Sequence, residues 1–278
     1  MLVGFRRCLI ESGKAENTVK SYCLAVRGFL HWYQGIRGQP PAQLLRQDVL
    51  NYITYLRTIR ELSNRSVNAK LAALQALNEF LIETGHQTEL VLSKRDYLRV
   101  QTAYANPSTI SKDQVEMFRQ QILAGQGLRD YAIVTVLAYA GLRISEVLAL
   151  RLGDVDLAAR EITVQHGKGD KMRVVFIGDK VVNAIKEYLQ RRPSTDSPYL
   201  FLSRKGGALS RGQVNRIFNL YSDTITPHTL RHFFCSNAIE AGYSINEVAN
   251  QAGHSNIHTT LLYTNPTRER MKEKANLL

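Results

Sequence analysis

The chain has 278 residues, of which 44% are hydrophobic and 22% are charged, a composition that excludes a largely disordered protein. Its longest apolar runs fall short of the roughly 20 residues that a membrane span needs, and Met1 begins no signal peptide. The 36 Lys+Arg residues outnumber the 24 Asp+Glu residues and give a net charge of +12, which suits a nucleic-acid partner and a merely basic housekeeping protein equally well.

Residues 1–92 show the apolar spacing of amphipathic helices. A first helix is predicted after Asn17, a second begins near Asp48, and a third follows Ser63, each preceded by a residue type that favours helix starts. Their apolar faces predict a small helical bundle whose role is binding. The candidate phosphate contacts of this part, for which a solvated charged face is an equally good explanation, are Arg57, Arg60, Arg65 and Lys70.

Residues 93–110 are basic and lack a sustained period, which predicts a linker. A second domain, residues 111–278, then begins near Ser111. Its segment Tyr131–Tyr139 is strongly apolar and predicts a buried helix that ends near Gly141.

Two short β-rich runs, Glu161–His166 and Met172–Ile177, flank the turn Gly167–Lys171 and predict a hairpin. Helical patterns follow, so the expected fold is mainly α with a small β-hairpin or sheet in the C-terminal domain. The predicted helices are Lys180–Gln190, Ser210–Tyr221, Pro227–Gly242, Ile245–Ala252 and a short amphipathic one at 267–278.

A motif of possible chemical use begins at Thr226, a good helix cap, and Pro227, which suits the first helical position. His228 then falls in the first turn, and Arg231 lies one turn further on the same side. A helix N-terminus with these two side chains suits a phosphoryl oxygen. Taken alone, a helix start with a structural histidine explains the motif better.

Two upstream motifs offer further cations. Arg143 follows the apolar helix and precedes Glu146 by one turn, so it suits a bidentate grip on a phosphate or, equally, a buried ion pair. Lys168 occupies a glycine-flanked turn, from which it could protonate a leaving oxygen as a general acid. Turn lysines are usually only solvated, and this motif alone is weak.

Two downstream motifs complete the set. His254 follows a helix end and could donate a hydrogen bond to a phosphate, although a packing histidine is the simpler explanation. Tyr263 would ordinarily be a half-buried core residue. A phenol with a pKa of about 10 becomes a useful nucleophile only where positive charge and a proton acceptor stabilise the phenolate.

Taken in order, these motifs resemble the tyrosine recombinase, or phage integrase, family. The resemblance covers essentially the whole chain, including Asn17-Thr18 and Phe29 to Trp32 in the helical N-terminal part, and the size matches the compact Xer-type members. The motifs that carry it are Ala140-Gly141-Leu142-Arg143-Ile144-Ser145-Glu146, Gly167-Lys168-Gly169, His228-Thr229-Leu230-Arg231, Gly253-His254-Ser255 and Tyr263.

The resemblance implies a helical core-binding domain and a catalytic domain that together form a C-shaped clamp around DNA. It also implies individual roles: phosphate binding by two arginines and one histidine, support by Glu146, and a covalent tyrosine. By motif, Arg143 and Arg231 clamp the phosphate, Lys168 is the general acid, His228 assists proton transfer, His254 bonds the phosphate and Tyr263 is the nucleophile.

The resemblance further implies the partners and the setting. The substrate would be double-stranded DNA with inverted-repeat core sites. Four protomers would assemble on two such sites by exchanging their C-terminal helices, 267–278. They would exchange the DNA strands in pairs through a Holliday junction. No cofactor and no metal would be needed, and the protein would work in the cytoplasm near a bacterial or archaeal nucleoid. Further candidate DNA contacts in the catalytic domain are Lys171, Arg173, Arg204, Lys205, Arg211 and Arg216.

Two departures from the family pattern bear on the biological role. Ala252 stands where many relatives have leucine, and Tyr263-Thr264-Asn265-Pro266 replaces the commoner Tyr-Thr-His. They favour a mobile-element recombinase, such as a transposon resolvase of the TnpI type or a small integrase, over a chromosome-dimer-resolving Xer enzyme. The motifs are also compatible with a type IB topoisomerase and with a non-catalytic DNA-binding protein of the same fold.

Overall fold

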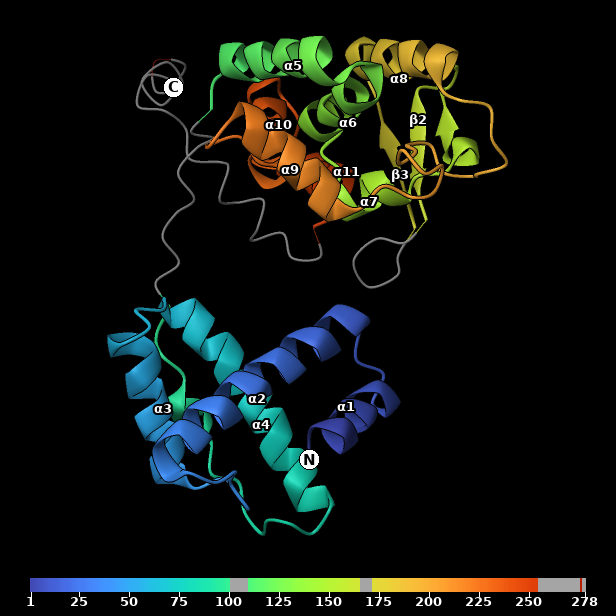
Figure 1. The fold of residues 1–278 in the computed structure, drawn as a ribbon. Helices are drawn as coiled ribbons and strands as arrows, with labels where there is room; N and C mark the ends of the chain where they lie inside the picture. The colour runs from blue at the N-terminus through green and yellow to red at the C-terminus, as the bar shows by residue number, and fades with distance from the viewer. Residues whose placement is uncertain (101–109, 166–171, 255–275, 277–278) are drawn as a thin grey trace. The chain divides into compact units, whose positions relative to one another are not determined.

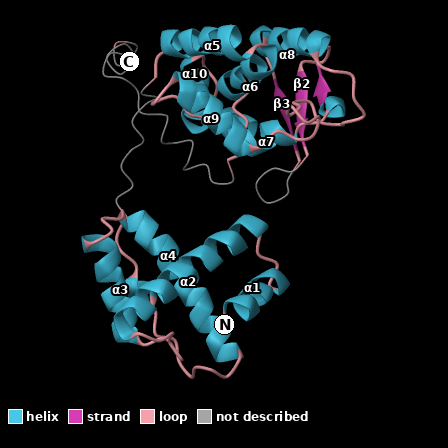
Figure 2. Ribbon diagram, viewed as in Figure 1, coloured by secondary structure: helices cyan, strands magenta, loops and turns pink. Residues whose placement is uncertain are grey.

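The structure is a computed structural model that describes residues 1–100, 110–165, 172–254 and 276. It divides the chain into two compact units, Met1–Thr102 and Ala103–Leu278, each with its own hydrophobic core. Figure 2 shows that helices dominate both units and that strands occur in the second. This confirms the predicted fold class, mainly α with a small sheet in the C-terminal part. None of the helices within the described ranges combines the length and hydrophobicity that crossing a bilayer requires.

The N-terminal unit is a helical bundle, as the apolar spacing predicted. Its third predicted helix carries the strongest capping signal, because the Ser63 hydroxyl accepts a hydrogen bond from the Ser66 N–H. A short first helix joins the three that the sequence specified, and its Phe5 and Leu9 are buried one turn apart. The four helices are α1 (Leu2–Glu11), α2 (Glu16–Arg37), α3 (Arg46–Thr58) and α4 (Asn64–Glu83).

Side-chain amides hold the chain that follows α4 against this bundle. The side-chain amide of the buried Gln87 accepts from the N–H of Leu44 and donates to its carbonyl. The amide of the buried Asn78 likewise accepts from the N–H of Val91 and donates to the carbonyl of Glu89. Further on, Asp96 pairs with Arg46 of α3 at 2.7 Å. The first part of the segment expected to be a linker therefore packs on the N-terminal unit, where it forms η1 (Lys94–Asp96).

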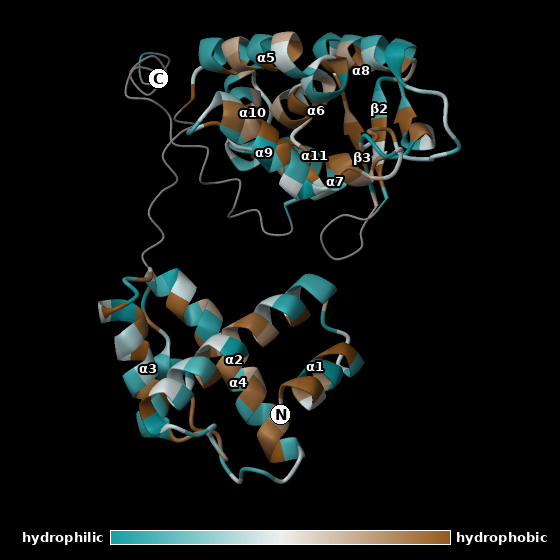
Figure 3. Cartoon of the chain, in the orientation of Figure 1, coloured by the Kyte–Doolittle hydropathy of each residue, from teal (hydrophilic) through white to brown (hydrophobic). Residues whose placement is uncertain are grey.

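The C-terminal unit is built around α6, which packs against α5, α8 and α10 (Figure 1). Nearly every side chain of α6 from Ala132 to Ala138 is buried, as its apolar run predicted, and Figure 3 shows its hydrophobic colouring. The helices are α5 (Lys112–Gln126), α6 (Leu128–Tyr139), α7 (Ile144–Ala149), η2 (Leu152–Asp154), α8 (Asp179–Arg191), α9 (Arg211–Tyr221), α10 (Pro227–Glu240) and α11 (Ile245–Ala252).

The predicted hairpin is present within a three-stranded antiparallel sheet of order β1-β2-β3. Ile162 pairs with Val175 and Val164 with Arg173, and the three aliphatic side chains face the core. The additional strand, Val155–Asp156, was not predicted because two residues are too few to show a period of two. The strands are β1 (Val155–Asp156), β2 (Glu161–Val164) and β3 (Arg173–Phe176).

The open edge of β3 is covered by α11. The buried Gln251 donates to the Phe176 carbonyl at 2.5 Å and accepts from the Phe176 N–H at 3.2 Å, so its amide replaces a neighbouring strand. An edge strand left uncovered exposes unpaired backbone groups. This contact fixes the end of α11, and therefore His254, relative to the sheet.

The turn between α6 and α7 requires glycine. Gly141 has a φ of +67°, and a Cβ atom there would lie 2.2 Å from Cδ1 of Phe234 on α10. Its carbonyl accepts a hydrogen bond of 2.7 Å from Arg231. The close approach of the backbone to α10 therefore sets the distance between the two helices that carry Arg143 and Arg231.

We expect Gly141→Ala to lower the free energy of unfolding by about 2–4 kcal/mol, because it adds a left-handed non-glycine residue and a collision with an aromatic ring. Gly153→Ala is the matched control, since Gly153 has open space around its Cα and no positive φ. Urea denaturation of both variants measures the difference. Equal stability of the two variants would contradict the assigned role of this turn.

Candidate active site

The structure brings four of the predicted site residues together from three helix ends. Arg143 precedes α7, His228 and Arg231 lie in the first turns of α10, and His254 follows α11. Nη2 of Arg143 donates to the carbonyl of Gly253 at 2.6 Å, which joins the first and last of these segments. Two predicted residues, Lys168 and Tyr263, lie outside the described residues.

Glu146 is the charged centre of this arrangement. It is 5% exposed and accepts from the Arg143 N–H and from Nη1 of Arg143, both at 2.8 Å. It also accepts from Nη1 and Nη2 of Arg173 at 3.0 and 2.8 Å. Burial raises the pKa of this carboxyl, but the hydrogen bonds and charge of Arg173 and Arg143 outweigh burial and lower it overall. Glu146 is therefore ionised at neutral pH and orients Arg143.

Arg173 has a different place from the other candidate DNA contacts. Its side chain is 14% exposed, and besides Glu146 it bonds the carbonyls of Gln251 and Ala252. Its guanidinium also lies against Gly253, where a Cβ would come within 2.6 Å of Cζ. These contacts commit the side chain to joining β3 to the end of α11. Nothing in the sequence, where Arg173 simply lies close to the predicted hairpin turn, indicated its contacts with Glu146 and the end of α11.

Arg231 is the most deeply buried cation among the described residues of the site, at 6% exposed. Burial, followed by the charge of Arg143, lowers its pKa to about 10, which still leaves it protonated at neutral pH. One turn further along α10, burial raises the pKa of the Cys235 thiol to about 11, so that side chain stays neutral. Arg231 thus places beside Arg143 a charge that forms no ion pair among the described residues.

The charge balance of the site favours an anion. Among the described residues, Glu146 pairs with Arg143 and Arg173, while Arg231 feels its charge without a direct hydrogen bond to it. Arg143 uses two side-chain donors in the contacts described above and Arg231 uses one, whereas each guanidinium has five N–H groups. Within the described part of the chain, the two arginines therefore keep charge and N–H donors that an anion could bind.

The histidines of the site are neutral at physiological pH. Partial desolvation, then Arg231 and Arg211, lower the pKa of His228, while burial and the nearby arginines lower that of His254 to about 4. Nε2 of His228 lies 2.8 Å from Nε2 of His232, whose pKa burial and His228 also lower to about 4. Neutral imidazoles can both accept and donate a proton. The spacing of His232 four residues after His228 was the only sequence signal for this pair.

The other candidate DNA contacts that the structure describes are exposed or half-buried on their own units. In the N-terminal unit Arg57, Arg60 and Arg65 are exposed and Lys70 is half-buried, while Lys171 lies outside the described residues. In the C-terminal unit the exposed basic residues precede α9 or lie on it, and Arg211 is close enough to His228 to affect its pKa. This second group consists of Arg204, Lys205, Arg211 and Arg216.

Residues 108–270, more than half of the chain, match the Phage integrase family. The chain belongs to the phage integrase family. Residues 2–85 match the N-terminal SAM-like domain of phage integrases, so the helical N-terminal unit is also part of the match. The resemblance that the motifs carried is confirmed.

Relatives in this family align over nearly the full chain. The TnP I resolvase of Bacillus thuringiensis is 48% identical over 278 aligned positions, and the alignment covers 99% of this chain and 98% of the relative. The tyrosine recombinase XerA of Pyrococcus furiosus is 32% identical and covers 100% of this chain and 94% of its own length. The tyrosine recombinase XerD of Listeria monocytogenes (strain F2365) is 29% identical, covering 95% of this chain and 93% of its own.

Solved structures show the same fold. The Tn1549 transposon integrase in complex with a circular intermediate DNA has a TM-score of 0.73 at 22% identity, covering 100% of this chain and 99% of that chain. A lambda integrase dimer bound to a core site has a TM-score of 0.70 at 15% identity, covering 95% of this chain and 94% of that chain. At these identities the likeness supports the phage integrase fold alone.

We expect Glu146→Gln to lower the free energy of unfolding by about 3 kcal/mol, because it leaves two partly buried arginines without their counter-charge. Glu187→Gln on the exposed side of α8 is the matched control and should change stability little. Urea denaturation at neutral pH compares them. A stability loss no larger than that of the control would show that Glu146 does not bind the arginines together.

We also expect stability to fall as the pH drops from 7.5 to 5.5. Unfolded histidines have a pKa of about 6.5 and take up protons in this window, whereas folded His232 and His254, with pKa values of about 4, do not. The unfolded state therefore binds more protons and gains population as the pH falls. The urea midpoint at both pH values measures this, and His254→Gln should flatten the dependence; a midpoint that rises on acidification would contradict it.

Proposed function

We propose that this chain is a site-specific DNA recombinase that cuts and rejoins DNA strands through a covalent bond to Tyr263. The observation that carries the proposal is that Arg143 and Arg231 lie close enough for their charges to interact, each bonded to a backbone carbonyl, with neutral histidines beside them. Such a site binds a phosphodiester and stabilises the extra negative charge of its pentacoordinate transition state. Family membership and the tyrosine recombinases among the relatives support the same activity.

In the proposed cleavage step, Oη of Tyr263 attacks the phosphorus while Arg143 and Arg231 bond the non-bridging oxygens. A P–O bond to tyrosine forms and the P–O5′ bond breaks. The phenolic proton passes to the neutral His228, and Lys168 donates a proton to the leaving 5′ oxygen. His254 hydrogen-bonds the phosphate.

The products are a 3′-phosphotyrosyl ester and a free 5′-hydroxyl. Attack by the 5′-hydroxyl of a partner strand reverses the step and restores the DNA. One phosphate ester replaces another throughout, so the reaction conserves bond energy and needs no ATP. The exchange of two strands at a time produces a Holliday junction.

The N-terminal unit is the proposed core-binding domain. Its exposed Arg57, Arg60 and Arg65 and the half-buried Lys70 supply positive charge for phosphates, and Arg204, Lys205, Arg211 and Arg216 do so on the catalytic unit. The proposed substrate is duplex DNA with inverted-repeat core sites, bound in the cytoplasm. Solved structures of related fold that contain DNA support this partner.

The proposed biological role is resolution or movement of mobile DNA. The TnP I resolvase aligns with this chain at 48% identity, against 32% for XerA and 29% for XerD. A supercoiled plasmid with two directly repeated sites tests the role. A recombinase separates it into two circles, whereas a type IB topoisomerase only relaxes it, with or without sites.

We expect purified protein to form an SDS-resistant adduct with a nicked duplex that contains its core site, which selection from a random-sequence library supplies. Tyr263→Phe should abolish the adduct, because phenylalanine offers no nucleophilic oxygen. Tyr243→Phe, at an exposed tyrosine of the same domain, is the matched control and should retain it. A DNA-bound wild-type protein that forms no adduct would refute catalysis in favour of a binding protein.

The proposed synapse is a homotetramer held by exchange of residues 267–278, whose predicted helical stripe of Met271, Ala275 and Leu278 lies outside the described residues. A surface pocket of about 410 Å³ in the catalytic unit, lined in part by the exposed Phe176 and Tyr243, is suited to an apolar segment.

Deletion of 267–278 should therefore leave adduct formation on the nicked duplex within about threefold, while recombination between two sites falls at least tenfold. Adduct assays and plasmid resolution measure the two activities side by side. Phe176→Ser should reproduce the split if this pocket accepts the segment. Full recombination by the shortened chain would contradict the exchange.

A further inference from the structure

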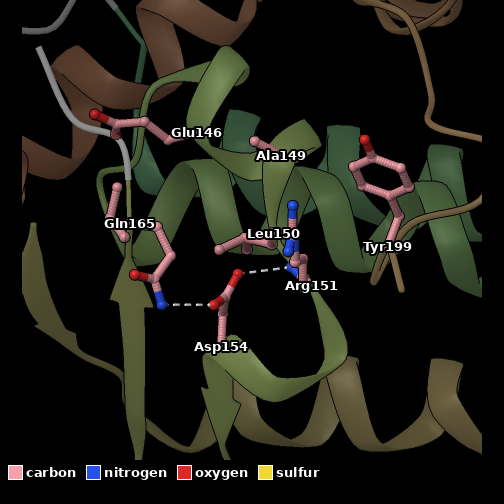
Figure 4. A pocket seen from close by; sticks show the side chains of 8 residues that line it. Glu146, Ala149, Leu150, Arg151, Asp154, Gln165 and Tyr199 are labelled. Atoms are coloured by element: carbon pink, nitrogen blue, oxygen red, sulfur yellow. Dashed lines mark hydrogen bonds between the residues drawn. The ribbon is translucent and has the colours of Figure 1, made fainter. Parts of the chain in front are cut away.

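Hydrogen bonds to the carboxylates around the site can run in only one direction. Asp154, 8% exposed, accepts from the backbone N–H of Arg151 at 2.8 Å and from Nε2 of Gln165 at 3.0 Å. Figure 4 shows these two bonds in a pocket of about 280 Å³ that Glu146 also lines. An ionised carboxylate only accepts and an N–H only donates, so the groups themselves settle the direction of each bond.

The hydrogen bond between His228 and His232 can run either way. Their Nε2 atoms lie 2.8 Å apart, and their rings are nearly perpendicular, at 85°, with centroids 4.2 Å apart. Two neutral imidazoles in this contact share one proton, because one Nε2 carries the hydrogen and the other offers its lone pair. A neutral imidazole has a single N–H, so the direction of the bond sets the tautomer of both rings.

The two directions give His228 different chemistry. If His228 accepts, its hydrogen is on Nδ1, and it has no lone pair for a further proton unless the bond breaks. If His228 donates, the lone pair on Nδ1 stays available and the bond survives protonation of the ring. Protonation then makes the bond charge-assisted, which is roughly twice as strong as a bond between neutral groups. A His228 that serves as a base therefore requires the second direction.

The surroundings place an added proton on His228 rather than on His232. His228 is exposed, whereas His232 is half-buried, and burial disfavours a charged imidazole. Burial, followed by the charges of His228 and Arg231, lowers the pKa of His232 to about 4. His254, after α11, is close enough to His232 for the two to affect each other electrostatically, and its own pKa is also about 4. His232 therefore stays neutral and can accept the hydrogen bond from a protonated His228.

The other neighbours of His228 oppose its protonation. Burial, then Arg231 on the same helix and Arg211 at the start of α9, lower its pKa. Arg143, before α7, adds positive charge next to Arg231. The first turn of α10 also lies at the positive end of the helix dipole. Within the described residues, the bond to Nε2 of His232 is the contact that offsets these effects.

We propose that His232 is a positioning residue for His228. It accepts the Nε2–H of His228, keeps Nδ1 as the nitrogen that takes the proton, and stabilises the imidazolium that forms. The proposal rests on the proton-acceptor role of His228 in the proposed function. In cleavage the proton of the attacking hydroxyl moves to Nδ1 of His228, and in rejoining the departing oxygen takes it back. A base oriented by a third group is a general way to activate a nucleophile.

The tautomers can be read directly, without DNA, from long-range proton–nitrogen correlation spectra of protein with isotope-labelled histidine. His228→Leu identifies the His228 signals by their loss. At neutral pH we expect hydrogen on Nε2 of His228 and on Nδ1 of His232. In His232→Leu the Nε2–H of His228 loses its acceptor, so both tautomers of His228 should be populated. Wild-type protein with its hydrogen on Nδ1 of His228 overturns the proposal, whether or not the variants fold.

The second test is the pH dependence of single-turnover cleavage of the nicked duplex that contains the selected core site. A neutral base loses activity as the pH falls through its pKa, which gives the rate an acidic limb. Without the acceptor at position 232 the imidazolium of His228 is less stable, so its pKa falls. We expect His232→Leu to move this limb to lower pH by about half a unit or more and to slow the plateau rate about 10- to 100-fold.

A conservative variant and a control accompany His232→Leu. In His232→Gln the amide oxygen can accept from Nε2 of His228, so the limb should stay in place and the rate should remain within about threefold of wild type. His86→Leu makes the same change as His232→Leu at an exposed histidine of the N-terminal unit and should match wild type. Gel-shift and urea denaturation confirm that each variant is folded and binds the duplex.

A mere loss of stability has the opposite signature, because a variant that unfolds more readily in acid loses activity at higher pH than wild type. A His232→Leu limb that is unmoved or raised, in a folded variant bound to DNA, overturns this inference and leaves the proposed function intact. Equal slowing of His232→Gln and His232→Leu does the same. His228→Leu should abolish the limb; a retained limb overturns the acceptor role of His228 and this inference with it.

Discussion

The bridge that Glu146 makes between Arg143 and Arg173 is the interaction on which the site depends. It joins the start of α7 to the start of β3 through four hydrogen bonds of 2.8–3.0 Å, one of them to the backbone of Arg143. Arg173 and Arg143 in turn bond carbonyls at the end of α11. One buried carboxylate thus fixes three segments that are remote in sequence, and the cost of burying its charge is offset because both partners are cations.

The same bridge explains the division of labour among the arginines. The donors of Arg173 bond Glu146 and the end of α11, so this arginine stabilises the fold around the site. Arg231 forms no ion pair with a carboxylate among the described residues, and it is held by the carbonyl of Gly141. The surplus of positive charge therefore falls between Arg143 and Arg231, where the neutral histidines surround it. Burial is the main cause of the lowered pKa of Arg231, and the charge of Arg143 is the second; an anion that entered this place would relieve that second effect.

Local patterns in the sequence predicted the helices well because apolar period and capping residues act within a few positions. The helix that ends at Tyr139 and the two β-rich runs that pair as β2 and β3 follow such rules, and the structure confirms them. The two-residue strand β1 and the amide of Gln251, which covers the sheet edge 75 residues away, carry no local signal. Their roles arise only from contacts between distant segments.

By itself, the sequence determined the family, the helical pattern and the set of chemical groups, because motif order and short-range spacing are properties of the chain. Tertiary structure decided how those groups are used. It tied Arg173 to Glu146 and the end of α11 and left Arg143 and Arg231 with the donors that we propose for a phosphate, although all three are arginines beside plausible motifs. The physical reason is that a guanidinium has a limited number of donors, and partners up to 110 residues away determine which of them remain.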